Sequence, residues 1–248
     1  MHFIGIIPAR YSSTRFPGKP LVDIGGKSMI QRVYEQASQA IERVYVATDD
    51  SRIFNHVEAF GGKVVMTSPN HKSGTDRCDE AIKKIQLNEE RIIFDVIINI
   101  QGDEPFIQPG QLRLLKSCFE DTDVDIATLA KEITDNSDIF NPNVVKVIID
   151  RDFKAIYFSR SPIPYVRNVD TVNWNTAHKF FKHLGIYAYR TKVLKQITMI
   201  KPSSLEIAES LEQNRWLENG FKIFVESTKL ETIAIDTPED LEKVKGMF

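Results

Sequence analysis

The stretch Ile4-Gly5-Ile6-Ile7-Pro8-Ala9-Arg10-Tyr11-Ser12-Ser13-Thr14-Arg15-Phe16-Pro17-Gly18-Lys19-Pro20, near the start of the chain, decides the fold. The apolar run 3–7 predicts a short buried strand that stops at Pro8. The loop after it holds three cations, Arg10, Arg15 and Lys19, with three hydroxyl side chains between them. Such donors stabilise clustered negative charge, and open α/β sheets bind ligands at strand ends, so we expect a polyphosphate site. A solvated basic loop is the alternative that composition alone leaves open.

Apolar runs alternate with helical patterns through the first half of the chain. Strands are predicted at 44–48, 63–66 and 94–100, and helices at 28–40, 51–60 and 75–87. This alternation predicts an α/β fold with a Rossmann-like, mostly parallel sheet and helices on both faces.

The second half is less regular. Strands are predicted at 125–133, 144–149, 155–158, 183–189 and near Phe224, and helices after Thr191, Ser203 and Asp236. Residues 161–182 are rich in proline, aromatic and polar residues, so we expect a smaller, β-containing excursion from the sheet. The expected organisation is a single domain over 1–248.

Composition excludes several classes of protein. The 248 residues are 42% hydrophobic, enough for one domain with a sizeable core, and 32 basic against 34 acidic residues argue against a nucleic-acid partner. The isolated cysteines, Cys78 and Cys118, are expected to be reduced and buried. No apolar run approaches membrane-spanning length and no signal-peptide pattern precedes the first strand, so we expect a cytoplasmic protein without a membrane partner.

Two common nucleotide motifs are absent. Gly26-Lys27-Ser28 ends like a phosphate-binding P-loop, but that motif needs glycine where the chain has Leu21. Ser28 is instead expected to cap a helix. No G-x-G-x-x-G follows a predicted strand, which argues against a nicotinamide dehydrogenase.

Two carboxylates are candidates for a metal site. Gln101-Gly102-Asp103-Glu104-Pro105 follows a buried strand, and Gly102 permits a tight turn that presents Asp103 at the strand's carboxyl end. A polar turn is the alternative, and we accept it for Glu104. Asp236, in Asp236-Thr237-Pro238-Glu239-Asp240-Leu241, is expected to end a second apolar strand, with Thr237 and Asp240 capping the next helix. Two such carboxylates could converge on one Mg²⁺ that also takes phosphate oxygens.

Ser73-Gly74-Thr75-Asp76-Arg77 runs from a loop into a helix, with Thr75 as the expected N-cap. A helix N-terminus after a glycine offers free backbone N–H groups to an anion or a base carbonyl. A simple glycine turn and cap is equally compatible with the sequence.

The first loop, the segment from His71 to Arg77 and the two aspartate motifs together resemble the CMP-Kdo synthetases. These cytidylyltransferases activate 3-deoxy-D-manno-octulosonic acid (Kdo). The resemblance covers 7–241, with small departures at Ser12, Phe16 and Ser204. It implies a nucleotide-diphospho-sugar transferase fold and an enzyme that transfers CMP from CTP to the anomeric hydroxyl of Kdo. Pyrophosphate is released, and the activated sugar serves lipopolysaccharide synthesis.

The resemblance also implies roles for individual residues. Four are implied to be catalytic, namely Arg10, Lys19, Asp103 and Asp236, and the two aspartates are implied to hold Mg²⁺. The implied nucleotide contacts are Arg10, Ser13, Arg15, Lys19, Ser73, Gly74, Thr75, Arg77 and Gln101. The segments Tyr157-Phe158-Ser159-Arg160 and His183-Leu184-Gly185-Ile186-Tyr187 resemble acceptor-sugar segments, and the implied sugar contacts are Arg160, His183, Tyr187, Glu212 and Gln213. By sequence alone, His183 could be an ordinary packed residue, and Glu212 and Gln213 could lie on a solvated helix face.

A homodimer is the last expectation. A monomer would expose the aromatics of 161–182, such as Trp174, Phe180 and Phe181, whereas a loop folded over its own sheet would bury them. The resemblance implies pairing of subunits through this segment. Competing functions are a CMP-sialate synthetase, whose first loop differs, a cytidylyltransferase for an amino-substituted eight-carbon sugar, and a non-catalytic nucleotide-binding module.

Overall fold

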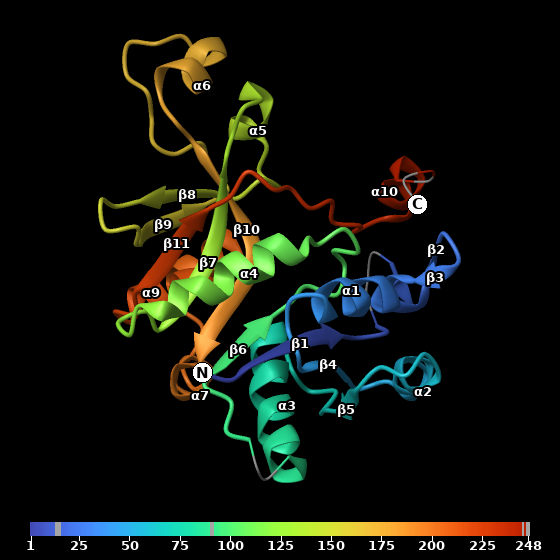
Figure 1. Ribbon diagram of the computed structural model, residues 1–248. Coiled ribbons are helices and arrows are strands. Elements are labelled where there is room, and N and C mark those ends of the chain that lie inside the picture. The colour runs from blue at the N-terminus through green and yellow to red at the C-terminus, as the bar shows by residue number, and fades with distance from the viewer. Residues whose placement is uncertain (13–15, 90–91, 245, 247–248) are drawn as a thin grey trace. The chain divides into compact units, whose positions relative to one another are not determined.

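The computed structural model describes residues 1–12, 16–89, 92–244 and 246. The chain divides into two compact units (Figure 1). Unit 1 contains Met1–Arg113, Ala188–Thr198 and Glu231–Phe248, and unit 2 contains Leu114–Tyr187 and Met199–Leu230. The single-domain organisation expected over 1–248 stays a prediction.

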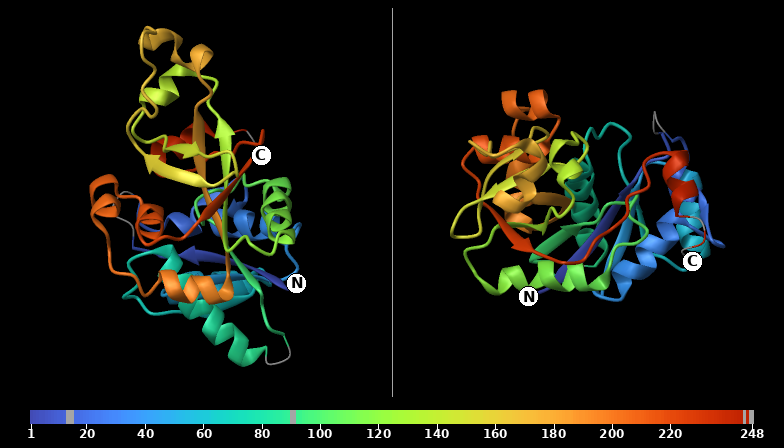
Figure 2. Two further views of the ribbon diagram at one scale, coloured as in Figure 1. Left: turned by 90° about the vertical axis from the view of Figure 1, so that its left-hand side faces the viewer. Right: turned by 90° about the horizontal axis from the view of Figure 1, so that it is seen from above.

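Unit 1 is built on parallel strands in the order β6-β1-β4-β5. Their bounds are Val96–Asn99, Phe3–Ala9, Val44–Thr48 and Val64–Met66. Helix α1 (Met29–Ser38) lies on one face of these strands and α3 (Gly74–Asn88) on the other (Figure 2). The mostly parallel sheet with helices on both faces is therefore confirmed.

Strand β1 does not stop at Pro8, as the sequence predicted, but continues to Ala9. The reason is that β1 has two different neighbours at this end. Pairing with β6 ends at Ile6 and Asn99, whereas pairing with β4 continues to Ala9 and Thr48. The Ile6 carbonyl accepts from the Ile100 N–H, on the β6 side of β1. The backbone nitrogen of Pro8, two residues later, faces the same side. Because pairing has already ended there, proline costs no hydrogen bond between strands.

Short polar caps fix where the helices of unit 1 begin. Ser28 caps α1 by accepting from the Gln31 N–H, as expected. Helix α3 is capped by Ser73, which accepts from the Asp76 N–H, so the prediction that Thr75 is the cap was wrong by two residues. Unit 1 also contains η1 (Lys19–Leu21), β2 (Asp23–Ile24), β3 (Lys27–Ser28), α2 (Ser51–Ala59), α7 (Thr191–Ile197) and α10 (Pro238–Lys243).

Unit 2 has a mixed sheet. Strands β7 (Ile126–Glu132) and β11 (Ile223–Ser227) are parallel, and β8 (Lys146–Ile149) is antiparallel to both β9 (Ala155–Ser159) and the start of β10 (Phe181–Arg190). Its helical elements are η2 (Cys118–Glu120), α5 (Asn136–Phe140), η3 (Thr171–Asn173), α6 (Trp174–Ala177), α8 (Ser204–Glu209) and α9 (Glu212–Glu218). Helix α4 (Pro109–Ser117), which the sequence reasoning missed, carries the chain from unit 1 into unit 2.

The excursion 161–182 is mostly irregular, with η3 and α6 as its short helical elements, and its strand content is the start of β10 at Phe181. Trp174 and Phe180 are 3% and 1% exposed and pack in one cluster with Ile133 and Ile139, near α5 (Figure 1). The expectation that a monomer would expose these two aromatics was therefore wrong. Tyr165, at 78% exposure, is the aromatic of the excursion that does face solvent.

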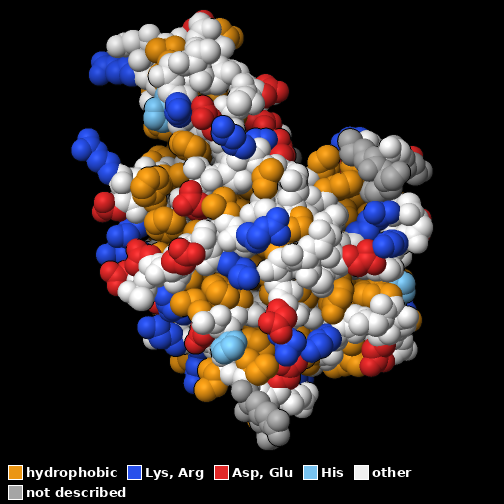
Figure 3. All heavy atoms as spheres, viewed as in Figure 1, with side chains coloured by type: hydrophobic (Ala, Val, Ile, Leu, Met, Phe, Trp, Pro, Cys, Tyr) orange, Lys and Arg blue, Asp and Glu red, His pale blue; other side chains and the backbone are white. Residues whose placement is uncertain are grey.

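Surface and core agree with the composition. Acidic and basic side chains are interspersed over the face drawn in Figure 3. Cys78 and Cys118 are both free and buried, as predicted. None of the helices in the part of the chain that the structure describes is long and apolar enough to span a bilayer.

Candidate active site

A cavity of about 240 Å³ opens in unit 1 where β1 and β6 end. It is lined by Pro8, Ala9, Arg10, Lys19, Pro20, His71, Lys72, Ser73, Gly74, Arg77, Gln101, Gly102, Asp103 and Asp236. All four residues expected to be catalytic are among them. The structure thus brings together segments that lie up to 228 positions apart, from Pro8 to Asp236.

Lys19 holds the two candidate metal ligands together. Its Nζ lies 2.7 Å from Asp103 Oδ2 and 3.1 Å from Asp236 Oδ1, and its side chain is 14% exposed. One ammonium group therefore bridges both carboxylates, so the two aspartates lie close together, and their role as Mg²⁺ ligands stays a prediction. At such distances the ammonium attracts both carboxylates and offsets the repulsion between them.

Backbone contacts place Asp236 beside Asp103. The Ile235 N–H donates to the Asp103 carbonyl at 2.9 Å, and Ile235 is fully buried in a cluster with Met29. The next helix starts at once, through a capping box between Thr237 and Asp240. The stretch before Asp236 is not part of a strand, contrary to the prediction, so the hydrogen bond of Ile235, its buried side chain and the bond from the Asp236 N–H to Asp240 hold this segment instead.

Two glycines let the backbone close in on Pro8. A Cβ at Gly102 would lie 2.9 Å from the Pro8 carbonyl oxygen, and one at Gly74 would lie 3.3 Å from the Pro8 ring. The first distance excludes a larger residue at Gly102 unless the chain moves, and the second is tight enough that the Pro8 ring would have to shift slightly. Gly102 is therefore required for close approach rather than for its turn conformation alone.

Glu104 is not the ordinary turn residue that the sequence suggested. Burial raises the pKa of its carboxyl group to about 7, and the negative charges of Asp103 and Asp236 add to the rise. A hydrogen bond from Thr232 acts in the opposite direction. The charges of the two aspartates thus disfavour ionisation of Glu104, and a cation bound to the aspartates would reduce this effect.

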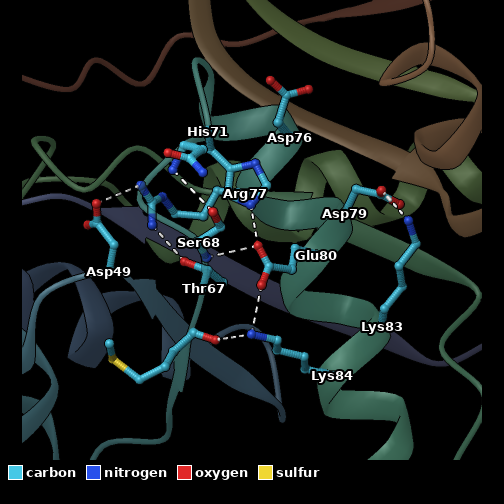
Figure 4. A network of polar contacts seen from close by, with 12 residues as sticks. Asp49, Thr67, Ser68, His71, Asp76, Arg77, Asp79, Glu80, Lys83 and Lys84 are labelled. Carbon is cyan, nitrogen blue, oxygen red and sulfur yellow. Dashed lines mark hydrogen bonds and ion pairs between the residues drawn. The ribbon is translucent and has the colours of Figure 1, made fainter.

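Arg77 lines the cavity but uses its guanidinium group elsewhere. Its Nη1 donates to Thr67 Oγ1 at 2.6 Å, and Nη2 lies 3.5 Å from Asp49 Oδ2 (Figure 4). Thr67 follows β5 and Asp49 follows β4, so Arg77, only 4% exposed, joins α3 to both strand ends. Thr75 is buried and is not one of the described residues that line the cavity.

The residues fit Mg²⁺ on the evidence of their own arrangement. The ammonium of Lys19 stands where a cation neutralises both carboxylates at once. Hard oxygen ligands are what Mg²⁺ prefers, and it commonly takes one or two carboxylates together with phosphate oxygens and water. No group of three or more metal-binding side chains occurs among the described residues, so substrate oxygens would have to complete the ligand set.

The loop between Arg10 and Lys19 is only partly described. Arg10 is exposed at the cavity rim, and Ser13 and Arg15 lie outside the described residues. On the near side of the gap, Tyr11 contacts Arg52, whose Cζ lies 3.3 Å from the ring centroid. On the far side, the Gly18 N–H donates to the Tyr11 carbonyl at 2.9 Å. These contacts fix both ends of the loop that carries Lys19.

The residues expected to bind the sugar all lie in unit 2. The rings of His183 and Tyr187 are 5.2 Å apart, and His183 Nε2 is hydrogen-bonded to Thr128 Oγ1 at 2.9 Å. Arg160 donates from Nε to the Glu209 carbonyl at 2.7 Å and from Nη1 to the Pro142 carbonyl at 3.0 Å.

The remaining two, Glu212 and Gln213, begin α9. Gln213 is 5% exposed and Glu212 is paired with Arg215 at 2.6 Å, so the solvated helix face that the sequence left open does not describe them. The sugar-binding roles of all five residues stay predictions.

The pH dependence of stability should report on His183. Burial lowers its pKa to about 3, whereas the ordinary value is 6.5. The unfolded chain therefore takes up this proton first, so the stabilisation is complete above pH 6.5 and is lost as the pH falls toward 3. We expect this group to lower the free energy of unfolding by at most about 1.4 kcal/mol per pH unit in that window. Urea unfolding between pH 6.5 and 5 measures the slope, which His183→Gln should flatten; parallel slopes for the two proteins would contradict the assignment.

Sequence reasoning missed several residues of the cavity. Lys72 adds a cation, and Pro8, Ala9 and Pro20 supply apolar wall. Lys72 lies directly between His71 and Ser73, which were already singled out, so its place in that segment was the available signal. Nothing in the local pattern marked the other three, because their role comes from the close approach of the two glycine loops.

Comparison with known proteins shows the family to which the chain belongs. The family model described as cytidylyltransferase matches residues 4–233. The chain therefore belongs to the cytidylyltransferase family.

Within that family, the relatives and a solved structure share one name. A 3-deoxy-manno-octulosonate cytidylyltransferase of Parabacteroides distasonis is 59% identical over 98% of this chain and 96% of its own length. One of Bacteroides thetaiotaomicron is 58% identical with the same coverage. The solved structure of a CMP:2-keto-3-deoxy-manno-octonic acid synthetase complexed with CTP superposes with a TM-score of 0.90. It is 43% identical and covers 100% of this chain and 98% of that one.

Proposed function

We propose that this chain is a CTP-dependent sugar nucleotidyltransferase that joins CMP to the anomeric hydroxyl of Kdo and releases pyrophosphate. The observation that carries the proposal is the bridge from Lys19 to Asp103 and Asp236 in a cavity at the strand ends. Relatives 49–59% identical over almost the whole chain bear the corresponding name. CMP-Kdo is the activated sugar for lipopolysaccharide synthesis, and the enzyme would supply it.

Positioning and charge neutralisation do most of the work in such a transfer. The sugar hydroxyl attacks the α-phosphorus of CTP, and pyrophosphate leaves in line. Arg10, Lys19 and Lys72 present three cations to the cavity, which suits a triphosphate and the charge that builds on the leaving group. Lys19 uses two of its three N–H groups on the aspartates, so the third can donate to a phosphate oxygen.

Asp103 and Asp236 are the residues that would hold Mg²⁺. Bound there, the ion would supply charge neutralisation at the α-phosphate and lower the pKa of the attacking hydroxyl. The two carboxylates themselves keep a fixed separation, because Ile235 is hydrogen-bonded to the Asp103 carbonyl. We propose this metal role on the strength of the ammonium bridge and the oxygen donor set.

The base is proposed to lie against the Ser73–Gly74 loop and Gln101. The start of α3 offers backbone N–H groups there, and Ser73 already caps the helix. Cytosine differs from uracil at its exocyclic group and ring N3, so UTP is the nearest competitor.

The proposed function is tested with a panel of nucleotides and acidic sugars. Pyrophosphate release is measured with CTP, UTP, ATP and GTP in turn, each against Kdo, its amino-substituted analogue and a sialic acid. We expect CTP with Kdo to give the highest kcat/KM. Equal use of purine nucleotides would refute the base site, preference for another acid would correct the acceptor, and no turnover with any pair would leave only a nucleotide-binding module.

The acceptor is proposed to contact unit 2 through Arg160, His183, Tyr187, Glu212 and Gln213. A guanidinium group is well shaped for the carboxylate of an acidic sugar. Desolvation keeps His183 neutral, so this ring can exchange hydrogen bonds with hydroxyl groups without adding charge.

We also propose a homodimer that forms through the solvent-facing side of the excursion. Tyr165 and Val172 are 78% and 68% exposed, and Tyr165 packs edge-on against the buried Trp174. Sedimentation equilibrium at micromolar concentration should give about twice the chain mass of 28.4 kDa. Tyr165→Lys is expected to sediment as a monomer and to keep the melting temperature of the wild-type protein. A wild-type protein that sediments as a monomer would contradict the proposal.

A cytoplasmic location is proposed as well, which the free thiols of Cys78 and Cys118 would suit.

A further inference from the structure

The connection from β5 to α3 forms one wall of the cavity. Residues 71–74 of this connection all line the cavity, yet they belong to no strand and only Gly74 is helical. A wall of irregular chain needs side chains to hold it in one conformation. These come from α3 itself (Figure 4).

Glu80, on the second turn of α3, reaches back to this connection. Its Oε2 accepts from the Ser68 N–H at 2.9 Å and is also hydrogen-bonded to His71 Nε2. Its Oε1 is 2.7 Å from Lys84 Nζ, and Lys84 donates in turn to the Met66 carbonyl at the end of β5. One carboxylate thus fixes the connection at its beginning and at its middle (Figure 4).

The contacts of Glu80 are partly buried and involve charged groups. The Glu80 side chain is 24% exposed and that of His71 is 19% exposed. Burial pushes the pKa of Glu80 upward, but the hydrogen bonds from Lys84, Ser68 and His71 outweigh it and lower the pKa to about 2. The group is therefore a carboxylate throughout the physiological range, and its acceptor oxygens are permanently available.

We propose that Glu80 is a positioning residue for the nucleotide, which fixes the cavity wall 71–74 without touching the ligand. Glu80 is not among the described residues that line the cavity, whereas His71, to which it is bonded, is. Arg77, one turn earlier on α3, holds Thr67 in the same way, so Glu80 extends an anchoring that begins at β5. This inference rests on the proposed function only in naming CTP as the nucleotide.

The test compares Glu80→Ala with Asp79→Ala. Asp79 precedes Glu80 on the same helix and pairs with Lys83 of that helix at 2.5 Å, so its variant controls for loss of a helix carboxylate (Figure 4). Calorimetry gives the Kd for CTP without the sugar, and steady-state rates give KM and kcat for CTP and for Kdo. Glu80→Ala should raise the Kd and KM for CTP by about tenfold and leave kcat and the KM for Kdo within about twofold. Asp79→Ala should leave all four near the wild-type values.

A second pair separates reach from charge and serves if Glu80→Ala fails to fold. Glu80→Asp keeps the charge but withdraws the oxygens by one methylene, so it should raise the Kd for CTP several-fold. Glu80→Gln keeps an acceptor for Ser68 and His71 and should bind nearly as the wild type does. Wild-type affinity in Glu80→Asp, or an equal loss in kcat and in both KM values, would overturn the proposal.

The outcomes also separate this inference from the proposed function. A wild-type chain that binds CTP but releases no pyrophosphate would refute the proposed function and leave the comparison of Kd values intact. A chain that binds no CTP at all would overturn both.

Discussion

Asp103→Asn is expected to lower kcat by about 100-fold or more while the chain still folds. Asparagine keeps the shape of the side chain and loses the charge that pairs with Lys19 at 2.7 Å. A neutral amide is also a much weaker ligand for Mg²⁺ than a carboxylate. The measurement is pyrophosphate release at saturating CTP and Kdo over a titration of Mg²⁺, with thermal unfolding to confirm the fold.

The control for this variant is Asp79→Asn, which removes a carboxylate of unit 1 that pairs with Lys83 outside the cavity. It should retain wild-type turnover. If Asp103→Asn turned over like the wild type at limiting Mg²⁺, the assignment of Asp103 to the metal and the catalytic step would be wrong.

Lys19→Met is expected to have the second largest effect, a fall in kcat of about 100-fold. Methionine fills a similar volume but leaves Asp103 and Asp236 without their shared cation. Without ligands, the two carboxylates then repel each other, which should cost about 1–3 kcal/mol of stability at neutral pH. Added Mg²⁺ should restore part of that stability, because the aspartates can share the ion instead.

Turnover and urea unfolding with and without Mg²⁺ measure both effects of Lys19→Met. Lys27→Met is the matched control, since Lys27 pairs with Glu35 at 2.6 Å on an exposed surface. Turnover of Lys19→Met within threefold of the wild type would show that the ammonium contributes to stability and not to catalysis.

The fold of unit 1 was largely predictable, because its strands are continuous apolar runs. The strand 44–48 was predicted with the bounds that β4 has, and the helices α1 and α2 were within two residues at each end. The errors came from contacts between distant parts of the chain. Pro8 stays in β1 because β6 has already ended beside it, which no local rule for proline contains.

Many residues of the site could be predicted from the sequence, but the contacts that place them could not. Asp236 was expected at a strand end, but it is held by the bond from Ile235 to the Asp103 carbonyl, a contact over 132 positions that sequence spacing cannot show. Arg77 was expected at the nucleotide site and does line the cavity, but its hydrogen bond to Thr67 and its approach to Asp49 had no signal in the local sequence. Trp174 was expected at a surface and is buried, because its partners Ile133 and Ile139 come from a separate segment.

The close approach of Gly74 and Gly102 to Pro8 bears on how an inhibitor of this site could lose its effect. A Cβ at Gly102 would collide with the Pro8 carbonyl oxygen at 2.9 Å, so single substitutions there damage the enzyme itself. Atoms of a drug that rest on this part of the wall would meet main chain that resistance mutations cannot easily remodel. At the rim, exposed Arg10 and Lys72 can change without disturbing the backbone, but such changes would remove cations that the triphosphate is proposed to need.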